Sequence, residues 1–183
     1  MLDNISKEHR NIASLLKVLE HKLELIRSGK TVKYKLIADI ISYMRDYSDK
    51  YHHPKEDVIY DYYRKYRSSD AQQTVSNKLE NEHDTLRQMT IELADVVELI
   101  LLDAVIPLDQ FSEKLENYIN YQWRHLDYEE QEVFPALKEA LTEDDWRNIE
   151  QNWEHSAARD PLFGPQIDKQ FEELAERIAI SES

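Results

Sequence analysis

Apolar residues recur at alternating steps of three and four along four long segments of this chain, and this spacing constrains the fold most. When such a segment is an α-helix, the steps place its apolar side chains on one face. The sequence has only 2 Gly and 5 Pro, too few for the turns that a protein of many strands needs. With 41% apolar and 33% charged residues, the composition suits helices that bury one face and expose the other. We therefore expect an all-α fold.

Four long helices are expected, at about residues 3–29, 34–66, 71–103 and 107–133. Gly29 suits the end of the first helix, because glycine readily adopts the backbone conformation of a helix C-cap. Pro54 lies inside the second helix and lacks a backbone donor, so we expect a kink there or a break close by. Pro135 should disturb the last turns of the fourth. Because the connections are short, the helices should pack as an up-down-up-down four-helix bundle.

The rest of the chain predicts a smaller helical part. Thr142 precedes three acidic residues and suits the N-cap of a short helix that ends near Ala158. A loop at 160–165 and a last helix at about 166–180 should follow. We assign residues 1–140 to the bundle and residues 141–183 to a C-terminal appendage, whose two short helices pack on one end of the bundle.

Charge and cysteine content exclude several classes of function. The formal net charge is −14, and a surface that acidic repels nucleic-acid phosphates and anionic lipids. The chain has 0 Cys, which excludes disulfides, zinc fingers and cysteine nucleophiles. No apolar signal core begins the chain, and no segment is long and apolar enough to span a bilayer. We expect a cytoplasmic protein that binds neither nucleic acid nor membranes and holds any metal through nitrogen and oxygen.

The apolar stripes also carry polar residues, and these repeat. Six of them form two matched sets, one in each half of the chain: His9, His52 and Glu56, then His83, His125 and Glu129. The first members of the two sets are 74 residues apart, and the second and third members are each 73 residues apart. Within each set the second His and the Glu are four residues apart, which places them on one helix face. The chain therefore resembles a duplicated helical hairpin.

Antiparallel packing would bring these six side chains together at the bundle axis. A carboxylate buried there without a partner is strongly destabilising or stays protonated. A pair of metal cations would compensate both glutamates and use the imidazole lone pairs. All six residues are therefore candidate metal ligands. Imidazole combined with carboxylate suits Fe, and also Mn or Zn.

The pattern H…HxxxE…H…HxxxE resembles the hemerythrin-like (HHE cation-binding) domain family, in its six-ligand subtype. The matching segments are residues 7–9, 51–57, 81–84 and 125–135, and the loop at 160–164 is similar to the tail of bacterial members. The resemblance implies a non-haem di-iron centre of two Fe ions, bridged by both glutamates and by an oxo or hydroxo group, with the histidines capping each ion. One open position would then remain on each iron for a small ligand.

Two positions differ from those of the oxygen-carrying hemerythrins. The carriers have a second His one turn from the ligand on the third helix, where this chain has Leu79 and Arg87. They also have an Asp five positions after the last His, the place of Glu130 here. The resemblance thus implies a protein that binds or senses oxygen, peroxide or nitric oxide, and argues against reversible oxygen carriage.

The alternative is a di-iron redox enzyme: a peroxidase or catalase-like protein, a nitric oxide or oxygen reductase, or an iron–sulfur repair protein. Both functions use the same centre, so the sequence leaves open whether the protein is an enzyme. With such a centre, the protein could have an electron-donor protein as a partner, or it could form a homo-oligomer.

Other readings of these residues stay open. His53 and Asp57 are also four residues apart and could be the pair on the second helix, although the repeat favours His52 with Glu56. In that favoured reading His53 lies behind the ligands or at the surface. The cluster could also be structural and hold zinc or no metal. Several polar residues within two turns of the candidate ligands could contact a bound ligand: Tyr47, Ser48, Tyr51, Tyr118, Tyr121, Gln122 and Tyr128.

Overall fold

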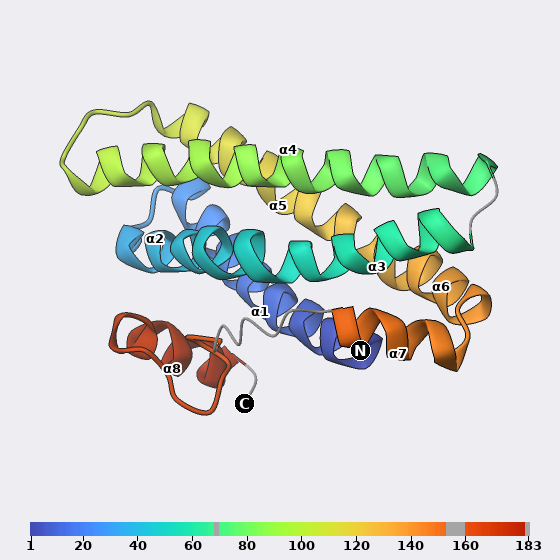
Figure 1. The fold of residues 1–183 in the computed structure, drawn as a ribbon. Helices are drawn as coiled ribbons and strands as arrows, with labels where there is room; N and C mark the ends of the chain where they lie inside the picture. Colours follow the sequence, from blue (N-terminus) through green and yellow to red (C-terminus); the bar gives the residue numbers. More distant parts are fainter. Residues whose placement is uncertain (68–69, 153–159, 182–183) are drawn as a thin grey trace.

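A computed structural model describes residues 1–67, 70–152 and 160–181, and it confirms the all-α fold (Figure 1). Four helical rods form the bundle. The first is α1 (Leu2–Arg27), and the third is α4 (Asp70–Leu101). The second is a continuous run of α2 (Tyr34–Tyr43), the π-helical segment η1 (Met44–His52) and α3 (His53–Tyr66). The fourth joins α5 (Leu108–Tyr128), the π-helical segment η2 (Glu129–Val133) and α6 (Phe134–Ala140).

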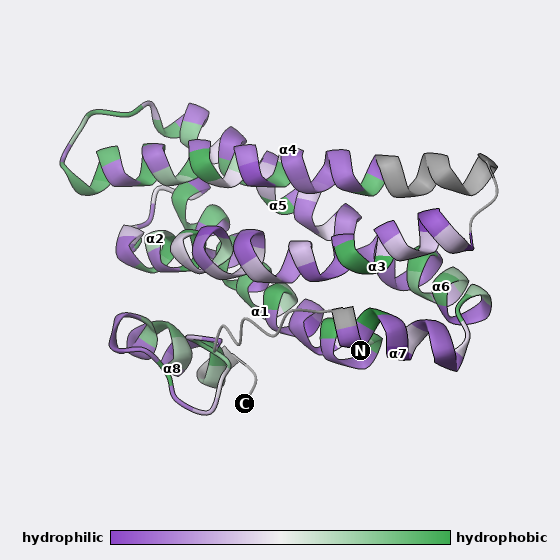
Figure 2. Ribbon diagram, in the orientation of Figure 1, coloured by the Kyte–Doolittle hydropathy of each residue, from purple (hydrophilic) through white to green (hydrophobic). Residues whose placement is uncertain are grey.

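Successive rods run in alternate directions, as expected for an up-down-up-down bundle (Figure 1). Helix α1 packs against α5, and α2 packs against α4. Figure 2 shows hydrophilic and hydrophobic residues alternating around each helix, the pattern of a rod with one buried face. Among the described helices, none has an apolar stretch that could cross a membrane.

The C-terminal end of the first helix follows the sequence closely. Helix α1 ends at Arg27, and Gly29 has a positive φ of 69°. The amide of Gly29 donates to the carbonyl of Ile26, and the amide of Lys30 donates to that of Leu25. These bonds satisfy carbonyls at the helix end, and glycine adopts the required conformation without a steric cost.

The second and fourth rods each contain a π-helical segment two residues before a proline. Segment η1 ends at His52, and Pro54 lies in the first turn of α3, where a missing amide has no cost. Segment η2 ends at Val133, and Pro135 lies in the first turn of α6. A proline cannot donate to the carbonyl four residues earlier, and a π-helix uses the wider i→i+5 spacing. The break expected near Pro54 is thus a change of helix type within a continuous rod.

The apolar core falls into two clusters with a buried polar layer between them. Along α1, Ile5 belongs to one cluster and Ile12 to the other. Along the second rod, Tyr47 belongs to the cluster with Ile12, and Ile59 belongs to the cluster with Ile5. The candidate ligands on these rods lie between those residues, so each half of the core closes one side of the polar layer.

The C-terminal helices are α7 (Glu143–Asn152), the short 3-10 helix η3 (Lys169–Phe171) and α8 (Glu172–Ser181). The expected extension of α7 to Ala158 lies outside the described residues, and the last helix begins later than residue 166. Helix α7 contributes Ile149 to the cluster with Ile5, whereas α8 contributes Leu174 and Ile178 to the cluster with Ile12. The two helices therefore cover opposite ends of the bundle (Figure 1), and the expectation that they share one end is wrong.

Candidate metal centre

The six candidate ligands come from all four rods and meet in the polar layer, each at most 4% exposed. Glu56 on α3 has Oε1 3.0 Å from Nε2 of His9 on α1. Its other oxygen, Oε2, lies 3.5 Å from Nε2 of His83 on α4. Glu129, the first residue of η2, has Oε2 3.3 Å from Nε2 of His9. Both carboxylates thus face imidazoles from more than one rod.

The two His–Glu pairs of the repeat also lie side by side as their spacing requires. His52 Nε2 is 3.5 Å from Oε1 of Glu56, four residues later. His125 Nε2 is 3.4 Å from Oε2 of Glu129. His83 Nε2 approaches Oε1 of Glu129 at 3.5 Å. The four Nε2 atoms therefore all turn towards the two glutamates, and the sequence-based grouping of these six residues matches their positions.

The outward nitrogen of each of these imidazoles faces a second carboxylate. The four Nδ1–oxygen pairs are His9 with Glu130 at 2.8 Å, His52 with Glu8 at 2.8 Å, His83 with Asp57 at 2.7 Å, and His125 with Glu82 at 3.1 Å. An ionised carboxylate only accepts hydrogen bonds, so Nδ1 carries the hydrogen. Once Nε2 gives up its own hydrogen, its lone pair can bind a cation, the arrangement common to histidine metal ligands.

These four carboxylates were missed in the sequence, although their positions follow its repeat. In each half, one directly precedes the first His and the other directly follows the Glu: Glu8 and Asp57, then Glu82 and Glu130. Each reaches a histidine on a different rod, so no spacing along one helix could identify the pairs. The duplication seen in the sequence thus extends to the hydrogen bonds around the six residues.

Several buried atoms in the polar layer have no hydrogen-bond partner among the described residues. They include Nε2 of His52, His83 and His125, and Oε2 of Glu56 and Glu129. Buried polar atoms are seldom left unpaired, because the loss of hydration is unfavourable. A cation would accept these lone pairs, and a set of imidazole nitrogens and carboxylate oxygens fits Fe, Mn or Zn. The residues present therefore fit a metal centre.

The contacts between the imidazoles and the carboxylates also shift the pKa values of these buried groups. Burial alone would lower the pKa of His9, but its contacts with Glu129 and Glu56 raise that pKa to about 11. Against the same effect of burial, Asp57 and Glu129 raise the pKa of His83 to about 10. Burial opposes ionisation of Glu129, yet the surrounding imidazoles hold its pKa well below the usual range. The two glutamates thus favour positive charge at the centre of the layer.

His53 is buried beside the candidate ligands, so the structure excludes the surface, one of the two places expected for it. It is 1% exposed, and its ring stacks 4.4 Å from that of His83. Burial and the neighbouring imidazoles hold its pKa well below the usual value. Its neighbour in the alternative pair, Asp57, contacts Nδ1 of His83 instead.

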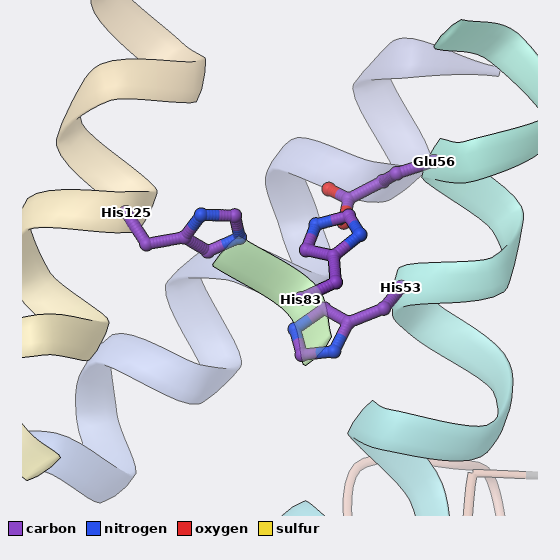
Figure 3. A group of neighbouring side chains, drawn as sticks. All are labelled: His53, Glu56, His83 and His125. Carbon is purple, nitrogen blue, oxygen red and sulfur yellow. The ribbon is translucent and has the colours of Figure 1, made fainter. Parts of the chain in front are cut away.

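Among the residues that the structure describes, the donor atoms form two groups that share Glu56, each with all atoms within 4.8 Å of one another. One group contains His9, His52 and Glu56. The other contains His53, Glu56, His83 and His125, and Figure 3 shows these four side chains converging from α3, α4 and α5.

One tyrosine contacts the centre directly. The hydroxyl of Tyr60 donates to Oε1 of Glu129 at 2.7 Å, and both side chains are buried. Tyr60 was missed, although it lies one turn after Glu56 on α3. Of the tyrosines singled out in the sequence, Tyr118 accepts a hydrogen bond from Gln122, and Tyr128 lies under the ammonium group of Lys78.

A surface cavity of about 620 Å³ lies beside this centre. Its walls include Glu8 and Lys55, which form an ion pair. Glu8 also accepts the hydrogen bond from Nδ1 of His52. Lys7, Asn11 and Tyr47 also line it. The cavity therefore lies on the side of the centre that contains His9 and His52.

Comparison with known proteins adds one finding to this geometry. The model of the hemerythrin HHE cation-binding domain matches residues 1–137, a range that includes the first three rods, all but the last three residues of the fourth, and the six candidate ligands. A search of curated proteins finds no match to the chain.

Proposed function

The chain belongs to the hemerythrin HHE cation-binding family, and on that premise we propose that it is a non-haem di-iron protein that binds or senses a small redox ligand. Oxygen, peroxide and nitric oxide are the ligands that such a centre suits. Six residues would hold the two ions: His9, His52, Glu56, His83, His125 and Glu129. Iron bound there would supply open coordination positions and one-electron redox chemistry.

The observation that carries this proposal is the set of unpaired donor atoms around two buried glutamates. The Nε2 atoms of His52, His83 and His125, and Oε2 of Glu56 and of Glu129, are buried without hydrogen-bond partners among the described residues. Packing alone would favour apolar side chains at such positions, because unpaired buried polar atoms destabilise a fold.

The chain's own residues would orient the centre and exclude water from it. Each of the four carboxylates that accept from Nδ1 fixes the ring orientation of one histidine and increases its basicity at Nε2. The two apolar clusters close the polar layer from both ends of the bundle. The hydroxyl of Tyr60 holds one oxygen of Glu129 and thereby limits the rotation of that carboxylate.

Metal analysis followed by ligand binding tests the proposal. Freshly purified protein should contain two iron ions per chain, or take up two when ferrous iron is supplied without oxygen. Admission of air should then produce new charge-transfer absorption in the near-ultraviolet and visible range. Iron content well below two per chain, together with an unchanged spectrum, would contradict the proposal.

A redox enzyme is the second candidate, and the cavity beside Glu8 and Lys55 favours it by offering space for a reactant next to the centre. Consumption of peroxide or nitric oxide in the presence of a reductant separates the two functions. Turnover would assign an enzyme, whereas binding without consumption would leave a binding or sensing protein.

A further inference from the structure

His53 is buried beside the candidate ligands and, like them, has a carboxylate near its Nδ1, although this nitrogen makes no hydrogen bond among the described residues. Its Nδ1 lies 3.3 Å from Oδ1 of Asp49, an acidic residue one turn earlier, and the two side chains are 1% and 2% exposed. A carboxylate likewise faces Nδ1 of His9, His52, His83 and His125. His53 is therefore a fifth buried imidazole with an acidic residue on its Nδ1 side.

The position of His53 associates it with one half of the centre. Its ring lies 4.4 Å from that of His83 and 5.8 Å from that of His125. One donor atom of His53 lies within 4.8 Å of donor atoms of His83, His125 and Glu56 (Figure 3). The group of His9, His52 and Glu56 does not include it.

Local helix geometry explains why two consecutive histidines face inward. His52 is the last residue of η1, and His53 is the first of α3. A π-helix has more residues per turn than an α-helix, so consecutive residues are separated by a smaller rotation. On α4, by contrast, the residues one turn from His83 are Leu79 and Arg87, and neither can bind a metal through an imidazole.

We propose that His53 is a fifth imidazole ligand and binds the metal ion held by His83 and His125. The inference rests on the proposed function, because it requires two metal ions in the polar layer. The two ions are then unequal: three imidazoles bind one of them, and His9 and His52 bind the other. Both glutamates are shared.

Proton NMR of the cobalt-loaded protein counts the imidazole ligands. Co²⁺ strongly shifts the Nδ1 proton of each imidazole that binds it through Nε2, and burial of the five rings slows the exchange of these protons with water. The wild-type protein should show five shifted exchangeable signals, and His53→Leu should show four. His21→Leu is the matched control, because His21 is 65% exposed on α1, and it should keep all five.

Chelator competition provides an independent measurement. In His53→Leu one of the two Co²⁺ ions should be lost at least about tenfold more readily, since imperfect ligand shells reduce metal affinity by this order. The other ion should be retained as in the wild type. Thermal unfolding of chelated samples shows whether the variant folds: His53→Leu removes a buried polar atom, so its metal-free form should unfold no earlier than that of the wild type.

Four shifted signals in both proteins, with unchanged affinity for both ions, would overturn the assignment of His53 and leave the di-metal centre intact. A wild-type protein that binds fewer than two ions would instead contradict the proposed function itself.

Discussion

Nδ1 of His9 donates a hydrogen bond to Glu130 over 2.8 Å, although the two residues are 121 positions apart in the chain. The same ring places Nε2 3.0 Å from Glu56. Glu130 itself is 39% exposed, whereas its neighbour Glu129 is fully buried among the imidazoles. In the oxygen-carrying hemerythrins, an Asp at the position of Glu130 would be a metal ligand. In this chain that position orients a histidine, and the preceding residue faces the centre.

Glu130→Gln should weaken metal binding without unfolding the bundle. An amide oxygen is a weaker acceptor than a carboxylate, so Nε2 of His9 becomes less basic and its ring less well oriented. Loss of such a partner typically lowers metal affinity by about 10–100-fold. Competition with a chelator measures the change. Glu132→Gln is the matched control, because Glu132 is an exposed neighbour in η2, and its affinity should equal that of the wild type.

His125→Ala should abolish binding of at least one metal ion and destabilise the protein. The substitution removes the imidazole 3.4 Å from Glu129 and leaves that buried carboxylate poorly compensated. Removing the partner of a buried charge in this way costs about 3–5 kcal/mol. Metal analysis and urea unfolding give the two quantities, with His21→Ala as the exposed control. If metal content and unfolding midpoint both stay at wild-type values, the cluster is structural.

Tyr60→Phe should lower the free energy of unfolding of chelated protein by about 1.5–3 kcal/mol, the usual contribution of a buried hydrogen bond to a charged group. The reason is that Oε1 of Glu129 loses its donor at 2.7 Å. Denaturant titration measures the effect. Tyr63→Phe, at a second buried tyrosine of α3, is the control. Equal losses in both variants would show that the hydroxyl of Tyr60 has no special role.

Acid should loosen α7 before the rest of the bundle. The guanidinium of Arg67 donates two hydrogen bonds to Asp145 at 2.9 Å, and Thr142 donates two more from its amide and hydroxyl. These contacts hold the pKa of Asp145 well below its usual value, with Arg67 the main cause. A lowered pKa stabilises the folded state above the unfolded pKa near 4, and this stabilisation fades as the pH falls further.

Hydrogen exchange measured at about pH 6 and about pH 3 tests this behaviour of α7. Wild-type α7 should exchange faster at the lower pH, relative to α1. Asp145→Asn should already exchange fast at about pH 6 and respond less to acid. Asp144→Asn is the control, because Asp144 is exposed and forms a local ion pair with Arg147, three residues later. A full acid response in Asp145→Asn would assign the effect to other groups.

Much of the centre was accessible from the sequence because its pattern is local. His52 with Glu56, and His125 with Glu129, lie one helical turn apart, so their spacing alone predicts a shared face. The duplication then relates His9 to His83 and extends the set to six residues. His53 could not be assigned in this way, since an ideal α-helix turns a residue next to His52 away from it. The π-helical segment η1 changes that direction.

The sequence by itself determined the four amphipathic rods, their order and the six polar residues on their buried faces, because these depend on periodicity along single helices. Only the tertiary structure decided which carboxylate orients which histidine, that Tyr60 holds Glu129, and that His53 faces His83. The physical reason is that each of these contacts joins different rods or follows a local change of helix type. Their distances depend on how the rods pack, and no spacing along one rod encodes them.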